Sequence, residues 1–172
     1  DSTAGANTLS AAVSTQFDVT AATASKLVWT TQPVDVANRA VMPTAPTLRV
    51  LDAYNNHVLS DFSTTVELEV RNSASGQVTP AFTDGINKRA SGGVVSFDNL
   101  ASGLPANEYL LSVRAATFSN VALSNLGGNS AAFDITAGKP AQLAFSRAAS
   151  GSPSTQALGV MPKLAIRDAD GN

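Results

Sequence analysis

Hydrophobic and polar residues alternate along much of this chain with a period of two. Between residues 64 and 71 the apolar side chains stand at 66, 68 and 70, and charged side chains stand at 67, 69 and 71. Residues 108–114 alternate in the same way and place Tyr109, Leu111 and Val113 on one face. The pattern predicts antiparallel strands that bury one face and expose the other.

Six further segments have strand-like composition, and clusters of Gly, Pro, Asn and Ser separate them. The sequence has no segment with the period of an amphipathic helix. Strands at this spacing predict an all-β fold, an antiparallel β-sandwich of about seven strands in roughly a hundred residues. The longest irregular segments, 72–91 and 115–130, are expected to be loops, where a rigid sandwich carries its binding residues. The six segments are 26–31, 47–52, 94–97, 131–136, 142–146 and 163–168.

An internal repeat divides the chain. Residues 17–56 return without a gap as residues 133–172, so that residue 17 corresponds to residue 133 and the displacement is 116 positions. The run FDVT returns as FDIT, and the run DAYNN returns as DADGN. A period the size of a small domain predicts a tandem array of modules.

The repeat also predicts the domain boundaries. Residues 1–22 are expected to be the C-terminal end of a preceding module, 23–138 a complete module, and 139–172 the start of a following module. The joints hold only a few residues, so successive modules should touch and form a semi-stiff rod.

The last part of the chain poses a packing problem. Residues 139–172 supply two strands, which cannot close a sandwich by themselves. Unpaired strands with large apolar side chains are an aggregation hazard, so we expect these to belong to something larger. The apolar side chains concerned are Leu143, Phe145, Leu164 and Ile166.

Composition narrows the class of protein. The chain is 44% hydrophobic and only 14% charged, against a usual charged share of about 25%. This mix is typical of β-rich secreted bacterial modules, so we expect a secreted or cell-surface location. A net charge of −2 without a basic patch argues against nucleic acid and anionic membranes as partners. The absence of cysteine excludes disulfides and thiolate metal sites.

The sequence shows neither a membrane-spanning segment nor a signal peptide. No apolar run approaches the roughly 18 residues of a membrane-spanning helix, so we expect no membrane insertion. The first residues lack the basic start and apolar stretch of a signal peptide, and any such signal would lie upstream.

Five short motifs in order resemble a known family. They are KLVWTTQP from residue 26, VLDAYNNHV from 50, GVVSFDNL from 93, EYLLSV from 108 and FDIT from 133. The series resembles the immunoglobulin-like modules repeated in large bacterial secreted and cell-surface proteins, in the style of invasin and intimin adhesins. The resemblance covers residues 23–138 and both flanks. It implies an immunoglobulin-like sandwich that acts as a stalk, spacer or adhesion unit.

One position departs from the family pattern. Asn55 stands where these modules usually have glycine, and Gly171 restores glycine in the second copy. An exchange between Asn and Gly predicts a backbone with positive φ at this place in a turn.

The run DADGN is also a candidate calcium site. Asp168, Asp170 and Asn172 alternate as oxygen ligands do in calcium loops. The alternative is a turn in which the first Asp caps backbone N–H groups. Tyr54 replaces the middle Asp in the first copy, and no Glu follows at ligand spacing, so we expect the turn. Calcium stays the less favoured alternative, and no other cofactor is indicated.

The sequence offers little catalytic chemistry. His57 is the only histidine and lies near Ser60 and Asp61, but members of a catalytic triad converge from distant parts of a chain. We therefore interpret His57 as a solvated turn residue. Glu67 and Glu69 have a spacing that superficially suits glycoside hydrolysis, and we interpret them as exposed charges that guard a strand edge.

Two further features bear on packing and crosslinking. Trp29 corresponds to Phe145, so an aromatic side chain recurs in the first strand, and a core position is expected rather than a sugar-stacking platform. Lys26, Lys88 and Lys139 could enter internal isopeptide bonds, but their spacing selects no partner.

The sequence therefore predicts a non-enzymatic structural or adhesive repeat of an extracellular bacterial protein. Its expected partners are neighbouring modules of the same polypeptide and other copies of itself, with a cell-surface or glycan ligand left open. Two alternatives remain at this stage. One is a subunit of a surface filament or sheath assembled by strand exchange. The other is an accessory module of a secreted hydrolase.

Overall fold

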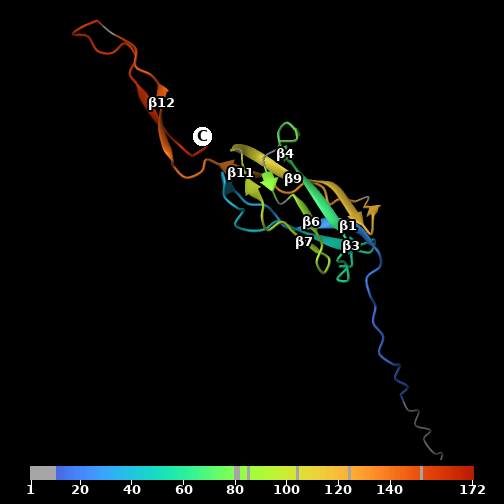
Figure 1. Ribbon diagram of the computed structural model, residues 1–172. Helices are drawn as coiled ribbons and strands as arrows, with labels where there is room; N and C mark the ends of the chain where they lie inside the picture. The colour runs from blue at the N-terminus through green and yellow to red at the C-terminus, as the bar shows by residue number, and fades with distance from the viewer. Residues whose placement is uncertain (1–10, 80–81, 85, 104, 124, 152) are drawn as a thin grey trace, which may run out of the picture.

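The protein folds into strands, turns and extended segments. The computed structural model describes residues 11–79, 82–84, 86–103, 105–123, 125–151 and 153–172, with thirteen strands and no helix in these ranges. The predicted all-β sandwich is confirmed: two sheets pack face to face between residues 23 and 136 (Figure 1).

The smaller of the two sheets forms one layer of the sandwich. Its three strands are antiparallel and lie in the order β1-β3-β7. Leu27 of β1 and Leu48 and Val50 of β3 point into the core because alternate residues of a strand face the same side. The strands are β1 (Ala24–Thr31), β3 (Thr47–Asp52) and β7 (Val94–Ser96).

The larger sheet lies opposite, in the order β2-β11-β9-β4-β6, with β10 paired to β9. β11 runs parallel to β2, whereas the β11–β9, β9–β4 and β4–β6 pairs are antiparallel. A short β5–β8 pair lies beside this sheet. The strands are β2 (Val36–Ala37), β4 (Thr65–Asn72), β6 (Asn87–Arg89), β9 (Ala106–Phe118), β10 (Val121–Ala122), β11 (Phe133–Thr136), β5 (Phe82–Asp84) and β8 (Ala101–Ser102).

The core confirms the period-two pattern. The apolar side chains of β4 and the predicted inward face of β9 are buried against those of β1, β3 and β7. Phe133 of β11 packs with Tyr109 of β9, their ring centroids 6.2 Å apart. The buried residues of the larger sheet include Val66, Leu68, Val70, Tyr109, Leu111, Val113, Phe133 and Ile135.

Two expectations about the larger sheet were wrong. β4 is an interior strand between β9 and β6, so its charged residues do not guard an edge. The segments 72–91 and 115–130 are not wholly loops, because the first contains β5 and β6 and the second contains the end of β9 and β10. β6 has the polar sequence NKR and β10 has only two residues, so pairing with neighbouring strands holds them rather than apolar alternation.

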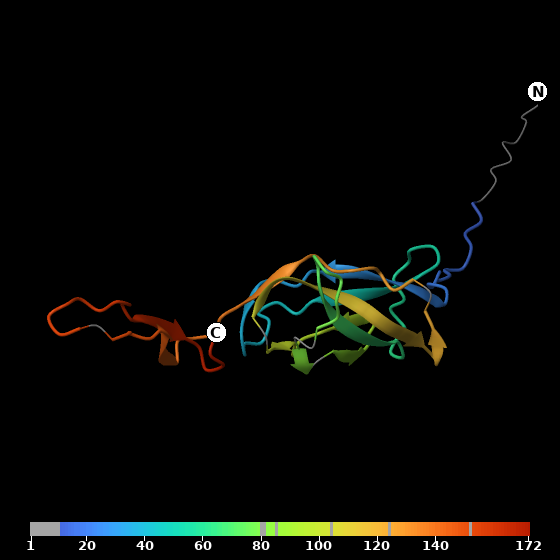
Figure 2. The same ribbon diagram turned by 90° about the horizontal axis from the view of Figure 1, so that it is seen from above.

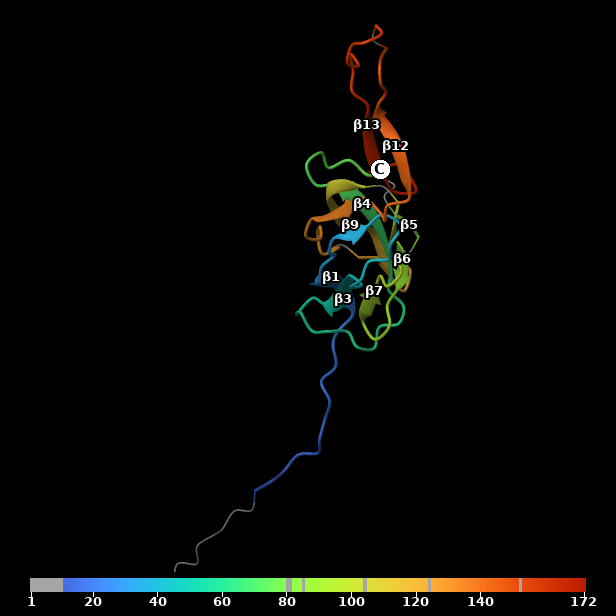
Figure 3. The same ribbon diagram turned by 90° about the vertical axis from the view of Figure 1, so that its left-hand side faces the viewer.

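The two ends of the chain leave the sandwich at opposite ends. A two-stranded hairpin of β12 (Gln142–Arg147) and β13 (Lys163–Arg167) projects from the end where β11 finishes. The N-terminal segment leaves from the other end, near the start of β1 (Figures 1 and 2). Figure 3 shows β12 and β13 side by side beyond the sandwich.

The hairpin has the same register as β1 and β3. Leu27 pairs with Val50, as Leu143 pairs with Ile166 116 positions later, and both pairs of strands have a register shift near the same relative point. Burial differs completely. Leu48 is 0% exposed, whereas Leu164, its counterpart in the hairpin, is 61% exposed. The hairpin therefore repeats the geometry of the smaller sheet without a second sheet over it.

This contrast gives a matched pair of substitutions. Leu48→Ala should lower the free energy of unfolding by about 2–5 kcal/mol, because it leaves a cavity in the core. Leu164→Ala should change it by less than about 0.5 kcal/mol, because this side chain is exposed. Urea unfolding followed by the fluorescence of Trp29, the single tryptophan, measures both. Equal losses in the two variants would contradict the exposed position of β13.

Candidate functional site

The first copy of the repeated turn is organised by one buried carboxylate. Asp52 Oδ1 accepts hydrogen bonds from the backbone N–H groups of Tyr54 (2.8 Å) and Asn56 (2.9 Å). Asp52 Oδ2 accepts the backbone N–H of Ala22 at 2.9 Å, which ties the N-terminal segment to the start of the sandwich. Asn55 has φ of 71°. The turn is thus closed by side-chain acceptance of backbone donors.

The second copy repeats this geometry at the other end of the sandwich. Asp168 Oδ1 accepts the backbone N–H groups of Asp170 (2.9 Å) and Asn172 (3.0 Å). Asp168 Oδ2 accepts the backbone N–H of Gly138 at 2.8 Å, and Gly138 corresponds to Ala22. Gly171 has φ of 88°. The predicted turn, with positive φ at the Asn/Gly position, is confirmed in both copies.

The second turn also contacts the sandwich. Asn38 Nδ2 donates to Asp168 Oδ2 at 3.2 Å and to Asp170 Oδ2 at 2.7 Å. Arg39 donates from Nε to Asp170 Oδ2 at 2.7 Å, and its Nη2 forms an ion pair with Asp170 Oδ1. This fork-to-carboxylate arrangement is bidentate, which fixes orientation as well as distance.

We call this region the joint: residues 37–40 of the sandwich, the linker 136–141, and residues 168–170 of the hairpin. The backbone N–H of Asn38 donates to the carbonyl oxygen of Thr136 at 2.8 Å, so the linker is held from both sides. A cleft of about 480 Å³ lies between the two parts. Gly138 lines this cleft, and a Cβ there would come within 3.1 Å of the Asn38 carbonyl oxygen. The linker is therefore tightly placed against the sandwich at Gly138, beside an open cleft.

The electrostatics of the joint favour ionised carboxylates. The backbone N–H of Gly138 and the other donors around Asp168 hold the pKa of that carboxyl far below its usual range. Arg39 lowers the pKa of Asp170 by hydrogen bonding and charge. At the other end, burial raises the pKa of Asp52, but hydrogen bonds from Ala22, Asn56 and Tyr54 outweigh burial and lower it to about 2.

These contacts bear on the calcium alternative. The oxygens of Asp168 face N–H donors, Asp170 is paired with Arg39, and Asn172 turns its Nδ2 donor toward Asp168. Within the described ranges, no three His, Cys, Asp or Glu side chains gather where they could hold a metal ion. The residues proposed as ligands therefore serve as acceptors and donors of the turn.

His57 has a role that the sequence did not suggest. Its Nε2 lies 3.1 Å from the carbonyl oxygen of Gly93, and the ring is half-buried rather than solvated. Asp61 accepts the backbone N–H groups of Ser63 (2.8 Å) and Thr64 (3.0 Å). Both side chains are thus engaged with backbone, so His57 is half-buried against Gly93 rather than the solvated turn residue that the sequence predicted.

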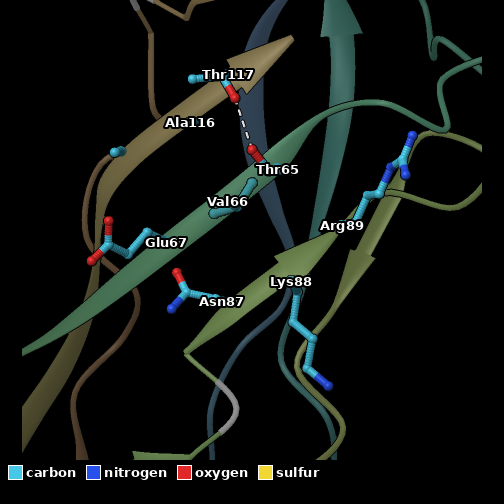
Figure 4. Close-up of a pocket in the computed structure, with 9 residues that line it drawn as sticks. Thr65, Val66, Glu67, Asn87, Lys88, Arg89, Ala116 and Thr117 are labelled. Atoms are coloured by element: carbon cyan, nitrogen blue, oxygen red, sulfur yellow. Dashed lines mark hydrogen bonds between the residues drawn. The ribbon is translucent and has the colours of Figure 1, made fainter. Parts of the chain in front are cut away.

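The carboxylates of β4 are paired with arginines. Glu67 forms an ion pair with Arg114 at 2.6 Å, and Glu69 pairs with Arg71. A shallow hollow lies over β4, β6 and β9, and in Figure 4 Lys88 points away from Glu67. Lys88 pairs with Asp98 instead, at 2.6 Å. The hollow therefore brings together no acid and base that could act on one substrate.

Trp29 is half-buried against the core, and its Nε1 donates to the carbonyl oxygen of Gly128 at 3.2 Å. This supports the expected core position, although its counterpart Phe145 is 67% exposed in the hairpin. The ring is thus oriented by packing and by one hydrogen bond.

Comparison with known protein families finds no family model that matches the chain, and no curated protein matches it. In the part of the chain that the structure describes, no helix is long and apolar enough to cross a membrane.

Sequence reasoning missed the sandwich side of the joint. Asn38 and Arg39 lie in the run VANRA, which has no turn residue apart from Asn38 and no charge pattern. The repeat gave no signal either, because residues 37–40 (ANRA) correspond to residues 153–156 (PSTQ) and share no residue type. The backbone nevertheless forms the same turn in both copies, with positive φ at Arg39 (63°) and at Thr155 (75°).

The shifted pKa of Asp52 predicts a specific acid sensitivity. Because its folded-state pKa of about 2 lies below its ordinary value of 3.8, its contribution is complete above about pH 4 and is lost as the pH falls toward about 2. Asp52→Asn should therefore flatten the fall in thermal midpoint of the sandwich between these pH values, measured by circular dichroism.

Asp168→Asn is the matched control, because it changes the second copy of the turn, which contacts the sandwich only at its end, through Asn38 and Gly138. It should leave the acid dependence of the sandwich nearly unchanged. An unaltered profile in Asp52→Asn would mean that the carboxylate of Asp52 is not coupled to folding.

Proposed function

We propose that this chain belongs to a modular extracellular rod of a bacterial surface protein. Residues 23–138 form one immunoglobulin-like module that acts as a stalk, spacer or adhesion unit without catalysis. The observation that carries the proposal is the hairpin, which repeats the register of β1 and β3 and exposes the side chains that those strands bury.

The exposed side chains of the hairpin form one apolar row. Leu143 and Ile166 pair across the strands, as do Phe145 and Leu164, and all four are at least 61% exposed. Their counterparts in the sandwich are Leu27, Trp29, Leu48 and Val50, which pack on the larger sheet. A row of this size is unfavourable in water, so strands like β4, β9 and β11 are the natural cover.

The arrangement of the ends supports a rod. The N-terminal segment and the hairpin leave from opposite ends of the sandwich (Figure 2), and each departure is held by the carboxylate of a repeated turn. Modules linked in this way lie end to end and contact only their neighbours. A rod of such modules holds a terminal domain away from a surface, and many weak contacts along it supply avidity.

A non-catalytic role is supported by how the polar groups are used. Asp52, Asp61 and Asp168 accept backbone donors, and His57 faces a carbonyl oxygen. These groups serve to hold turns and backbone, which is a structural use of polar side chains.

A second candidate is a filament subunit completed by strand exchange. Phe17 and Val19, the counterparts of buried Phe133 and Ile135, are 77% and 87% exposed. A neighbouring copy could therefore supply a last strand to the hairpin. Such a copy would not supply counterparts of β4 and β9, which is why the module array is preferred.

The test completes the second module. Asn172 corresponds to Asn56, so a second copy of residues 57–138 joined after Asn172 continues the chain in register. The extended chain should show a second cooperative unfolding transition and protection of the β12 and β13 amides from hydrogen exchange, because the apolar row becomes buried. Protection is measured by nuclear magnetic resonance.

The control carries Leu68→Asp in the added copy only, which places a charge in the new core and should abolish the protection. If the unaltered extension leaves the hairpin amides unprotected, the module proposal fails. The filament candidate predicts instead that the 172-residue chain associates with increasing concentration, and that Phe17→Ser weakens this association in sedimentation experiments.

A further inference from the structure

Both ends of the sandwich share one constant contact, and the end that carries the hairpin adds a contact between residues that vary from copy to copy. The constant contact is the turn carboxylate on the linker backbone, Asp52 with Ala22 and Asp168 with Gly138. The variable contact is the Arg39–Asp170 ion pair. It involves two positions that differ between the copies, because Thr155 corresponds to Arg39 and Tyr54 corresponds to Asp170.

We infer that the joint is a selective contact, in which the Asn38–Arg39 turn recognises an acidic turn of the following module. For the joints before and after this one, the inference rests on the proposed module array. At the joint with the preceding module, Tyr54 takes the place of Asp170 and requires a preceding turn suited to an aromatic ring. At the joint with the next module, Thr155 takes the place of Arg39 and presents a hydroxyl instead of a cation. The modules are therefore not interchangeable in order.

The backbone presents these variable residues in the same way. The N–H of Ala40 donates to the carbonyl oxygen of Ala37 at 3.0 Å, and the N–H of Gln156 donates to that of Pro153 at 3.2 Å, 116 positions later. The residue at position 39 or 155 has positive φ in each turn. A shared backbone with different side chains is what allows one scaffold to carry different specificities.

The turns that contain Tyr54 and Asp170 also share a backbone and differ in a side chain. Tyr54 and Asp170 occupy the same position of two turns with matching hydrogen bonds, and Tyr54 is 78% exposed. At the joint, Asp170 instead receives both Asn38 and Arg39. Putting a like charge or an uncharged ring opposite Arg39 loses the bidentate contact, and like charges add repulsion.

Selectivity of this kind differs from strength. An exposed ion pair contributes little to stability, because water and salt screen it. Its effect is on orientation, since Arg39 and Asn38 hold one carboxylate from two directions. A wrong partner would leave the linker contact of Asp168 intact while losing the fixed angle between the two parts.

The test measures the distribution of distances across the joint. The chain contains no cysteine, so Ser96→Cys and Ala148→Cys allow spin labels on exposed sites of the sandwich and the hairpin. Pulsed electron paramagnetic resonance should give a narrow distribution for this labelled chain. Arg39→Asp or Asp170→Arg alone should broaden it at least about two-fold, and the double exchange should restore the narrow width.

Two further variants probe the residues of the other copies. Asp170→Tyr and Arg39→Thr should each broaden the distribution, because each installs the residue of a different joint opposite an unaltered partner. The control exchanges the exposed pair Glu67 and Arg114, as Glu67→Arg with Arg114→Glu, and should not change the width. Unchanged Trp29 fluorescence verifies that the sandwich stays folded.

The inference is overturned if single reversals leave the width unchanged, if the double exchange does not restore it, or if the labelled chain is already broad. These outcomes are separate from those of the extension experiment. A restored width together with an unprotected extended hairpin would keep the selective joint and reject the module array.

Discussion

The acceptance of backbone N–H groups by the first carboxylate of the repeated turn is the interaction on which both ends of this protein depend. Asp52 and Asp168 each close their own turn and each capture the chain segment that enters the next part of the structure. A carboxylate has two acceptor oxygens, so one oxygen can close the turn while the other holds the linker, whereas an amide or a hydroxyl has only one acceptor oxygen. One residue type therefore fixes both a turn and a linker.

This double role explains why the linker at the joint is short and ordered without large apolar contacts. Linker residue Gly138 is held by Asp168, and Thr136 is held by the backbone of Asn38. The remaining contacts of the joint are polar side chains on carboxylates. An orientation set by hydrogen bonds depends on which donors and acceptors face each other, whereas a close-packed apolar interface depends on side-chain volume.

The sandwich and the hairpin together illustrate how the same strands depend on their surroundings. β1 and β3 are stable because the larger sheet covers Leu27, Leu48 and Val50. β12 and β13 keep the same pairing through backbone hydrogen bonds, although their apolar face is uncovered. The proposed role as one unit of a rod follows from this contrast, because the hairpin carries the counterparts of the core residues of β1 and β3 but has no sheet packed over them.

The pattern of residues was sufficient to predict the fold class, the inward residues of β4 and β9, and the turn at Asp52 and Asp168. Each of these follows from local physics: a period of two selects a buried face, and an Asn/Gly exchange marks positive φ. The repeat also placed the two strands of the hairpin, because they correspond to β1 and β3 116 positions earlier. These features depend on residues close in sequence, which is why pattern alone was sufficient.

The contacts between distant segments follow instead from the three-dimensional path of the chain. This path placed β4 inside a sheet, gave His57 the carbonyl oxygen of Gly93, and brought Asn38 and Arg39 to Asp170, about 130 positions away in the chain. Side chains such as Arg39 carry no local signal of a partner, because an exposed cation fits many environments. The joint forms because the fold pairs β11 with β2, which places the end of β11 beside the turn at residues 37–40.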